Sequence, residues 1–338
     1  MPSLCCAECF GDHGLRRSVI PSRAEVHGRC DFCNTTDVDL VAPSKLSAEF
    51  EMLTSIYELN PDGRLLVEWL KEDWSLFPKL DIANAKSLLA EIMDDGDIVR
   101  KTFTPSLAFK SEGLVAWTTL RDELMYKNRY FLDEALDKDR LEVLLSHLTT
   151  RELSDIWYRA RITTSDAGYP LDQMGAPPRN LASHGRANPS GIPYLYLGSE
   201  PETAIAEIRP HTGETASVAQ FTLQRPITAV DLRSPRELVS PFLLEDASEV
   251  GRMRADVPFL ERLGNELTRP VLPRSAAIDY LPSQYLCEFI KKIGYNGVIY
   301  RSSVSDGINL ALFDPEKAVA NSVALYDVQR VSVVVGPR

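Results

Sequence analysis

The stretch GRANPSGIPYLYLGSEPETAIAEIRP, residues 185–210, joins a glycine-rich loop to a strand and a helix. The loop carries Arg186, and the aromatic run at 193–198 has the composition of a β-strand. Residues 201–208 then have apolar side chains at helical spacing around Glu207. This close succession predicts a mixed α and β fold that carries a polar site.

The composition of the chain indicates a soluble globular protein. Its 338 residues are 44% hydrophobic and 25% charged, which excludes a fibrous or disordered chain. This length predicts two or three domains, at about 100 to 200 residues each. No apolar run approaches the roughly 18 to 20 residues that span a bilayer, so no membrane partner is expected.

The amino terminus and the net charge suggest a location and limit the partners. Residues 1–14, MPSLCCAECFGDHG, have neither the basic nor the apolar region of an export signal, which predicts a cytoplasmic protein with reduced thiols. The net charge of −11 disfavours general binding to nucleic acid, because affinity for phosphate backbones depends on lysine and arginine.

Five of the six cysteines lie in the first 33 residues. Two C-x2-C pairs, separated by twenty residues, are formed by Cys6, Cys9, Cys30 and Cys33. This spacing predicts a structural zinc site in a zinc-ribbon-like segment at 1–45. Cys5 in place of Cys6, His13 or His27 in place of a cysteine, and a cluster of reduced thiols are the alternatives.

Residues 46–150 have helical periodicity and predict a small helical domain. One helix is indicated by apolar residues at helical spacing, namely Leu46, Phe50, Leu53 and Tyr57. Another begins after Asp81, a residue suited to cap a helix. Arg140 and His147, with six residues between them, resemble the R-x4-6-H motif of HEPN-family ribonucleases, where the pair cleaves RNA. The alternative is a solvated arginine and a partly buried histidine.

After Ser154 the sequence changes to short strands rich in β-branched and aromatic residues, with helical stretches between them. This pattern predicts an α+β domain at 152–338. Neither a G-x-G-x-x-G after a strand nor a G-x4-GK[ST] is present, which disfavours a dinucleotide-binding Rossmann unit and a P-loop.

A polar set is distributed over this domain, and its members suit the cleavage of a dinucleotide. The set is Tyr158, Arg159, Arg186, Asn188, Tyr194, Tyr196, Glu207, Gln284 and Ser302. Arginine forks bind pyrophosphate, and tyrosine faces accept a stacked base or nicotinamide. A carboxylate beside a ribose stabilises an oxocarbenium-like transition state.

Each member of this set also has a purely structural interpretation. Glu207 can pair with Arg209 on its own helix, and Arg186 can satisfy loop carbonyls. The tyrosines can be core residues, and serines after a strand are often exposed.

The second half resembles the RES domain family over about 170 residues. The matching stretches are YRAR, GRANPSGIPYLYLGSEPETAIAEIRP, AVDLRS, LPSQYLCEFIKKIGYNGVIYRSS and NLALFD. The resemblance implies an ADP-ribosyltransferase-like fold and a toxin that consumes NAD by hydrolysis or phosphorolysis of the nicotinamide bond. By position it implies catalytic roles for Arg159, Arg186, Glu207 and Ser302, with Ser283 and Ser303 as alternative serines.

The first 150 residues resemble the cysteine-rich, HEPN-like extension that accompanies some RES domains, and we expect this extension to control or target the second half. NAD is the expected substrate and zinc the expected structural metal, with an antitoxin or regulatory protein as a further partner. An ADP-ribosyltransferase, a HEPN-type ribonuclease and a non-enzymatic zinc-ribbon adaptor are the alternative functions.

Overall fold

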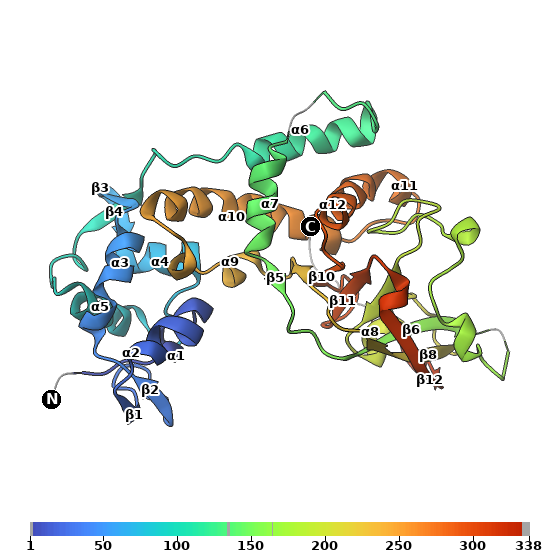
Figure 1. The fold of residues 1–338 in the computed structure, drawn as a ribbon, viewed down its shortest axis with the longest axis horizontal. Coiled ribbons are helices and arrows are strands. Elements are labelled where there is room, and N and C mark those ends of the chain that lie inside the picture. The colour runs from blue at the N-terminus through green and yellow to red at the C-terminus, as the bar shows by residue number, and fades with distance from the viewer. Residues whose placement is uncertain (1–2, 134–135, 164, 333–338) are drawn as a thin grey trace. The chain divides into compact units, whose positions relative to one another are not determined.

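The computed structural model describes residues 3–133, 136–163 and 165–332. It divides into two compact units (Figure 1). The first comprises Met1–Leu114 and Ser234–Leu260, and the second Val115–Arg233 and Glu261–Arg338. The three domains expected from the sequence stay a prediction. Among the helices in the described ranges, none is long and apolar enough to cross a membrane.

The first unit contains small helices and two separate pairs of strands. Its strands are β1 (Val26–Gly28), β2 (Val38–Leu40), β3 (Tyr57–Leu65) and β4 (Thr102–Pro105), and its helices are α1 (Ala7–Phe10), α2 (Ile20–Arg23), α3 (Ser47–Thr54), α4 (Leu66–Trp74), α5 (Ile82–Met93) and α9 (Pro235–Leu238). Helix α10 (Ala247–Thr268) begins in this unit. Aromatic side chains form part of the core, with the rings of Phe10, Phe50 and Phe77 in mutual contact.

The prediction that Tyr57 continues a helix from Leu46 is wrong. Helix α3 ends at Thr54, and Tyr57 begins β3, which pairs with β4. The buried Tyr57 hydroxyl donates to Asp73 over 2.9 Å. Strand pairing with residues more than forty positions away therefore overrides the local helical spacing, and this part of the chain is not purely helical.

The second unit has an eight-stranded sheet in the order β12, β8, β6, β7, β11, β10, β9, β5. The strands are β5 (Thr149–Thr150), β6 (Ile156–Thr163), β7 (Leu195–Gly198), β8 (Thr215–Leu223), β9 (Ala229–Asp231), β10 (Gly297–Arg301), β11 (Ile308–Leu312) and β12 (Ala318–Asp327). The helices are α6 (Gly113–Tyr126), whose first two residues belong to the other unit, α7 (Lys138–Ser146), α8 (Pro201–Glu207), α11 (Ala276–Asp279) and α12 (Leu281–Lys292). Strands β9 and β10 run parallel, and the other neighbouring strands run antiparallel. The predicted α+β class is confirmed.

The sheet register brings residues from three strands together at the centre of the sheet. Tyr158 of β6 and Asn309 of β11 both lie opposite Gly198 at the end of β7. Helix α8 follows immediately and packs on this point, since a Cβ at Gly198 would lie 2.8 Å from the backbone nitrogen of Ala204. This close approach brings the last turn of α8, with Glu207, near Asn309.

The cap of α5 offers a test of local stability. The Asp81 side chain accepts a hydrogen bond from the backbone nitrogen of Asn84 over 2.7 Å, as the sequence predicts for an N-cap. We expect Asp81→Ala to lower the free energy of unfolding by about 1 kcal/mol, measured by urea denaturation. Ser87→Ala, an exposed change on the same helix, is the control, and equal stability of the two variants would contradict the capping role.

Candidate functional site

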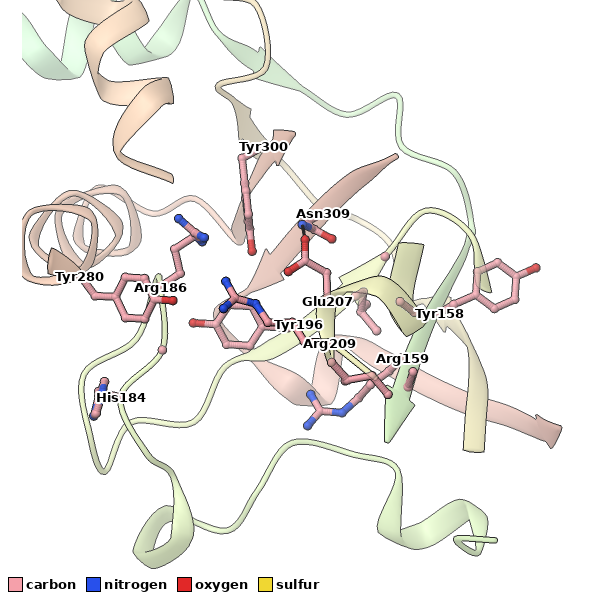
Figure 2. Close-up of a pocket in the computed structure, with 16 residues that line it drawn as sticks. Tyr158, Arg159, His184, Arg186, Tyr196, Glu207, Arg209, Tyr280, Tyr300 and Asn309 are labelled. Atoms are coloured by element: carbon pink, nitrogen blue, oxygen red, sulfur yellow. Dashed lines mark hydrogen bonds between the residues drawn. The ribbon is translucent and has the colours of Figure 1, made fainter. Parts of the chain in front are cut away.

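A cavity of about 350 Å³ opens in the second unit beside Glu207. Sixteen residues line it: Tyr158, Arg159, Ala160, His184, Gly185, Arg186, Tyr196, Leu197, Gly198, Ala204, Glu207, Ile208, Arg209, Tyr280, Tyr300 and Asn309. Figure 2 shows Glu207 beside Asn309, with Arg186 and Tyr280 on one side and Arg159 on the other. Three arginines face one carboxylate here, so the lining suits an anionic ligand.

Two hydrogen bonds fix Glu207, and both reach the same oxygen. Ser302 Oγ donates to Glu207 Oε1 over 2.7 Å, and Asn309 Nδ2 donates to it over 2.6 Å. Ser302 Oγ itself accepts from the backbone nitrogens of Val304 and Ser305, which directs its proton towards Glu207. Glu207 Oε2 has no such partner in the described part of the chain, so it stays available to a ligand.

Arg186 is buried, with 9% of its surface exposed, and its partners are neutral. Its Nη1 donates to the backbone oxygen of Arg269 over 2.8 Å, and its guanidinium carbon lies 5.4 Å from the centre of the Tyr280 ring. Within the described ranges no carboxylate pairs with Arg186. Its charge is therefore oriented but not neutralised.

Arg159 is the second cation without a carboxylate partner in the described residues. Its Nε atom is buried and makes no hydrogen bond there. Burial, reinforced by the charge of Arg161, lowers the pKa of Arg159 to about 10. Because this cation has a depressed pKa, its charge destabilises the folded protein at neutral pH, and a bound anion would offset that cost.

The loop that carries Arg186 is held by side chains which the sequence assigned to substrate binding. Asn188 Nδ2 donates to the backbone oxygens of Ser183 and Ile192, and Asn188 Oδ1 accepts from the Tyr196 hydroxyl. The Tyr196 ring lines the cavity, whereas the Asn188 side chain does not line it and makes its hydrogen bonds within the loop and to Tyr196.

Helix α12 supports the same loop through two neighbouring residues. Ser283 Oγ donates to the backbone oxygen of Arg186 over 2.6 Å, and Gln284 Nε2 donates to that of Gly185 over 2.8 Å. Neither Ser283 nor Gln284 lines the cavity, and both hold Arg186 from behind.

The remaining predicted residues divide between the cavity and the core. Tyr158 lines the cavity, but the Tyr194 ring packs 4.9 Å from that of Phe313 and lies outside it. Arg209 lines it as well and donates to the backbone oxygen of Val271, and no ion pair joins it to Glu207 in the described residues.

Several lining residues were not predicted: Asn309, Tyr300, Tyr280, Arg209 and His184. Asn309 and Tyr300 lie on apolar strands, so the sequence pattern indicates core positions for both. Burial raises the pKa of Tyr300 well above its ordinary value, so this hydroxyl stays neutral. Arg209, Tyr300 and Asn309 lie within the stretches that match the family, and His184 directly precedes the glycine-rich loop, but neither signal assigns these residues to the cavity.

The four predicted cysteine ligands come together in the first unit. The sulfur atoms of Cys6, Cys9, Cys30 and Cys33 all lie within 4.8 Å of one another. Sulfurs around zinc at about 2.3 Å lie about 3.8 Å apart, so this group fits the ion. The Cys6 and Cys33 sulfurs lie 3.5 Å apart, and the Cys9 and Cys30 sulfurs lie 3.3 Å apart. A zinc ion bound here would be held by four thiolates, and its binding would release the thiol protons.

The alternative ligands make other contacts. Cys5 Sγ donates to the backbone oxygen of Val41 over 3.5 Å. His13 Nε2 lies 2.9 Å from the backbone oxygen of Leu238, and His27 lies between Asp37 and Asp39.

Comparison with known proteins gives a family match over the region that builds the cavity. The model of the RES domain matches residues 156–333. A similar solved structure is the crystal structure of the M. tuberculosis MbcT-MbcA toxin-antitoxin complex, with 15% identity and a TM-score of 0.32. That match covers 55% of this chain and 93% of the other. A search of curated proteins finds no match.

The uncompensated Arg159 predicts that the cavity binds a dianion. We expect inorganic pyrophosphate to raise the unfolding temperature, and a ligand at about 100 times its Kd stabilises by about 2.7 kcal/mol. Arg159→Met should abolish this shift because the uncompensated cation is lost. Arg161→Met, two residues along β6 and outside the cavity, should retain it. A shift of equal size in Arg159→Met would contradict the site.

Proposed function

The chain belongs to the RES domain family, whose model spans residues 156–333, and on that premise we propose that it cleaves NAD between nicotinamide and ribose. The observation that supports the proposal most strongly is the orientation of the Glu207 carboxylate. One of its oxygens is held by Ser302 and Asn309, and the other, without a hydrogen-bond partner among the described residues, is available in a cavity lined by three arginines. A fixed carboxylate among cations suits a substrate with a negative pyrophosphate and a reacting carbon that becomes positive.

The arginines bind the substrate in this proposal. The pyrophosphate lies between Arg159 and Arg186, whose charges have no carboxylate partners in the described residues. The rings of Tyr196 and Tyr280 offer faces on which nicotinamide or adenine can stack. These contacts fix the nicotinamide ribose beside Glu207.

Glu207 then acts on the reacting carbon. As the bond from ribose C1′ to the nicotinamide nitrogen lengthens, the bonding electron pair leaves with neutral nicotinamide and positive charge develops on the ribosyl group. Glu207 Oε2 stabilises that charge. Ser302 lies behind the carboxylate, so its proposed role is to orient Glu207 and not to contact the ribose.

The group that attacks C1′ is water, phosphate or a macromolecule, and the same residues serve all three. Hydrolysis gives ADP-ribose, phosphorolysis gives its 1″-phosphate, and transfer to a macromolecule makes the chain an ADP-ribosyltransferase. A regulatory protein partner, which the resemblance to toxins led us to expect, also belongs to the proposal. Arg140 and His147 lie in and just after α7, outside the cavity, and the ribonuclease stays a prediction.

Kinetics of Glu207→Gln test the proposed role. Since the carboxylate acts on charge that appears only in the transition state, we expect kcat to fall by roughly 10² to 10³ with little change in KM for NAD. Nicotinamide, ADP-ribose and its 1″-phosphate would be resolved by chromatography, with and without inorganic phosphate. Glu202→Gln, an exposed change on the same helix, should retain full activity.

Two outcomes would refute the role. One is the absence of nicotinamide release from the unaltered chain. The other is an equal kcat in Glu207→Gln and Glu202→Gln.

For the cysteine cluster we propose one structural zinc ion held by Cys6, Cys9, Cys30 and Cys33. Four thiolates leave no open coordination position, so the ion would stabilise the fold without taking part in the reaction. We expect one equivalent of zinc by elemental analysis, and a lower unfolding temperature after chelation or in Cys30→Ser. Cys287→Ser is the matched control, because that thiol is buried far along the chain in α12. Metal-free protein that unfolds at the same temperature would contradict the site.

A further inference from the structure

A buried charge cluster lies behind the cavity in the second unit. At its centre is Glu266 of α10, whose side chain is fully buried. Arginine nitrogens lie 3.2 Å from its carboxylate oxygens in three ion pairs, with Arg121, Arg262 and Arg269. None of these residues lines the cavity. Buried ion pairs add little net stability, but the removal of one partner leaves an uncompensated charge, which strongly favours rearrangement of the surrounding residues.

Arg269 connects this cluster to the cavity. Its Nε donates to Glu266 Oε2 over 3.2 Å, and its Nη2 donates to the backbone oxygen of Asp279 over 2.8 Å. The backbone oxygen of Arg269 accepts the 2.8 Å hydrogen bond from Arg186 Nη1. The side chain of Arg269 thus ties its own backbone to Glu266 and to the end of α11.

The residue after Asp279 is Tyr280, which contacts the other side of Arg186. Its ring centre lies 5.4 Å from the guanidinium carbon of Arg186, and the ring lines the cavity. Ser303 Oγ adds a weaker contact to Arg186 at 3.5 Å. Two of the three partners that orient Arg186 therefore depend on the position of Arg269.

We propose that Glu266, acting through Arg269, is a positioning residue that sets Arg186 and Tyr280 for the diphosphate of the substrate. This inference rests on the proposed function and adds a residue that does not touch the substrate. Glu207 is held by Ser302 and Asn309, and the ion pairs of Glu266 are with other residues, Arg121, Arg262 and Arg269. Loss of the Glu266 charge should therefore weaken substrate binding and leave the chemical step nearly unchanged.

The test compares Glu266→Gln, Arg186→Ala and the double variant in the full chain. KM and kcat would be measured with NAD, and Kd with ADP-ribose as a probe of the diphosphate site. Glu266→Gln should raise KM and Kd on the order of tenfold and leave kcat almost unaltered. This rise is smaller than the roughly 100-fold loss that a misplaced binding group can cause. The loss of affinity in the double variant should be smaller than the product of the two single effects, because Glu266 acts in large part through Arg186.

Unchanged KM and Kd in Glu266→Gln would overturn the inference, as would a double variant in which the two effects multiply. Asp231→Asn is the matched control: it also removes a buried carboxylate paired with an arginine, Arg233, in the same unit. Its Kd for ADP-ribose should stay unchanged even if its stability falls. A rise in Kd equal to that of Glu266→Gln would show a general effect of destabilisation and overturn the proposal.

If Glu266→Gln does not fold, Arg269→Lys tests the same proposal. A lysine keeps a charge beside Glu266, but its single ammonium cannot also hold the backbone oxygen of Asp279, so the same rise in KM and Kd is expected. Unchanged values would again refute the proposal. If the unaltered chain binds ADP-ribose but releases no nicotinamide, NAD cleavage fails while the Kd comparison still decides the role of Glu266. If it does not bind ADP-ribose, both fail.

Discussion

The site depends on two hydrogen bonds to a single oxygen of Glu207. They come from Ser302 and Asn309, on either side of the turn between β10 and β11. Glu207 is the last residue of α8, so the helix has to pack closely on the sheet for these bonds to form. Gly198 permits this packing because any side chain there would meet the backbone of Ala204. One fixed oxygen and one free oxygen make Glu207 an oriented carboxylate with a face for a ligand.

Local charge in the cavity is opposite to the charge of the whole chain. The chain carries a net charge of −11, yet the lining has three arginines and one carboxylate. Arg159 is half-buried, and its surroundings lower its pKa to about 10. Arg186 is oriented by a carbonyl, a hydroxyl and a ring. Because no carboxylate in the described residues pairs with either arginine, both charges stay available, which suits the diphosphate that we propose as ligand.

Much of the fold follows from local sequence patterns. A high content of β-branched and aromatic residues indicated the short strands of the second unit, and Asp81 marked the start of α5 as an N-cap. Tyr57 was assigned to a helix because its pairing partners in β4 lie far along the chain, beyond the reach of local spacing. Strand order likewise depends on contacts between distant segments.

The site was only partly predictable, for a chemical reason. Arg159, Arg186 and Glu207 belong to recognisable motifs, and all three line one cavity. The Gln284 amide donates to a loop carbonyl, and it could donate to a ligand in the same way. The sequence therefore could not distinguish a structural role of Gln284 from a role in substrate binding. Asn309 was not predicted because it lies in an apolar strand. Its contact with Glu207 becomes visible only from the pairing of β11 with β7 and the packing of α8.

The most direct measurement is a crystal structure of the Glu207→Gln protein with intact NAD. The substituted side chain preserves the shape of the site while slowing cleavage. Our account predicts the pyrophosphate between Arg159 and Arg186, with ribose C1′ in contact with the side chain at position 207. NAD bound elsewhere, or bound here with its nicotinamide ribose away from that side chain, would contradict the account.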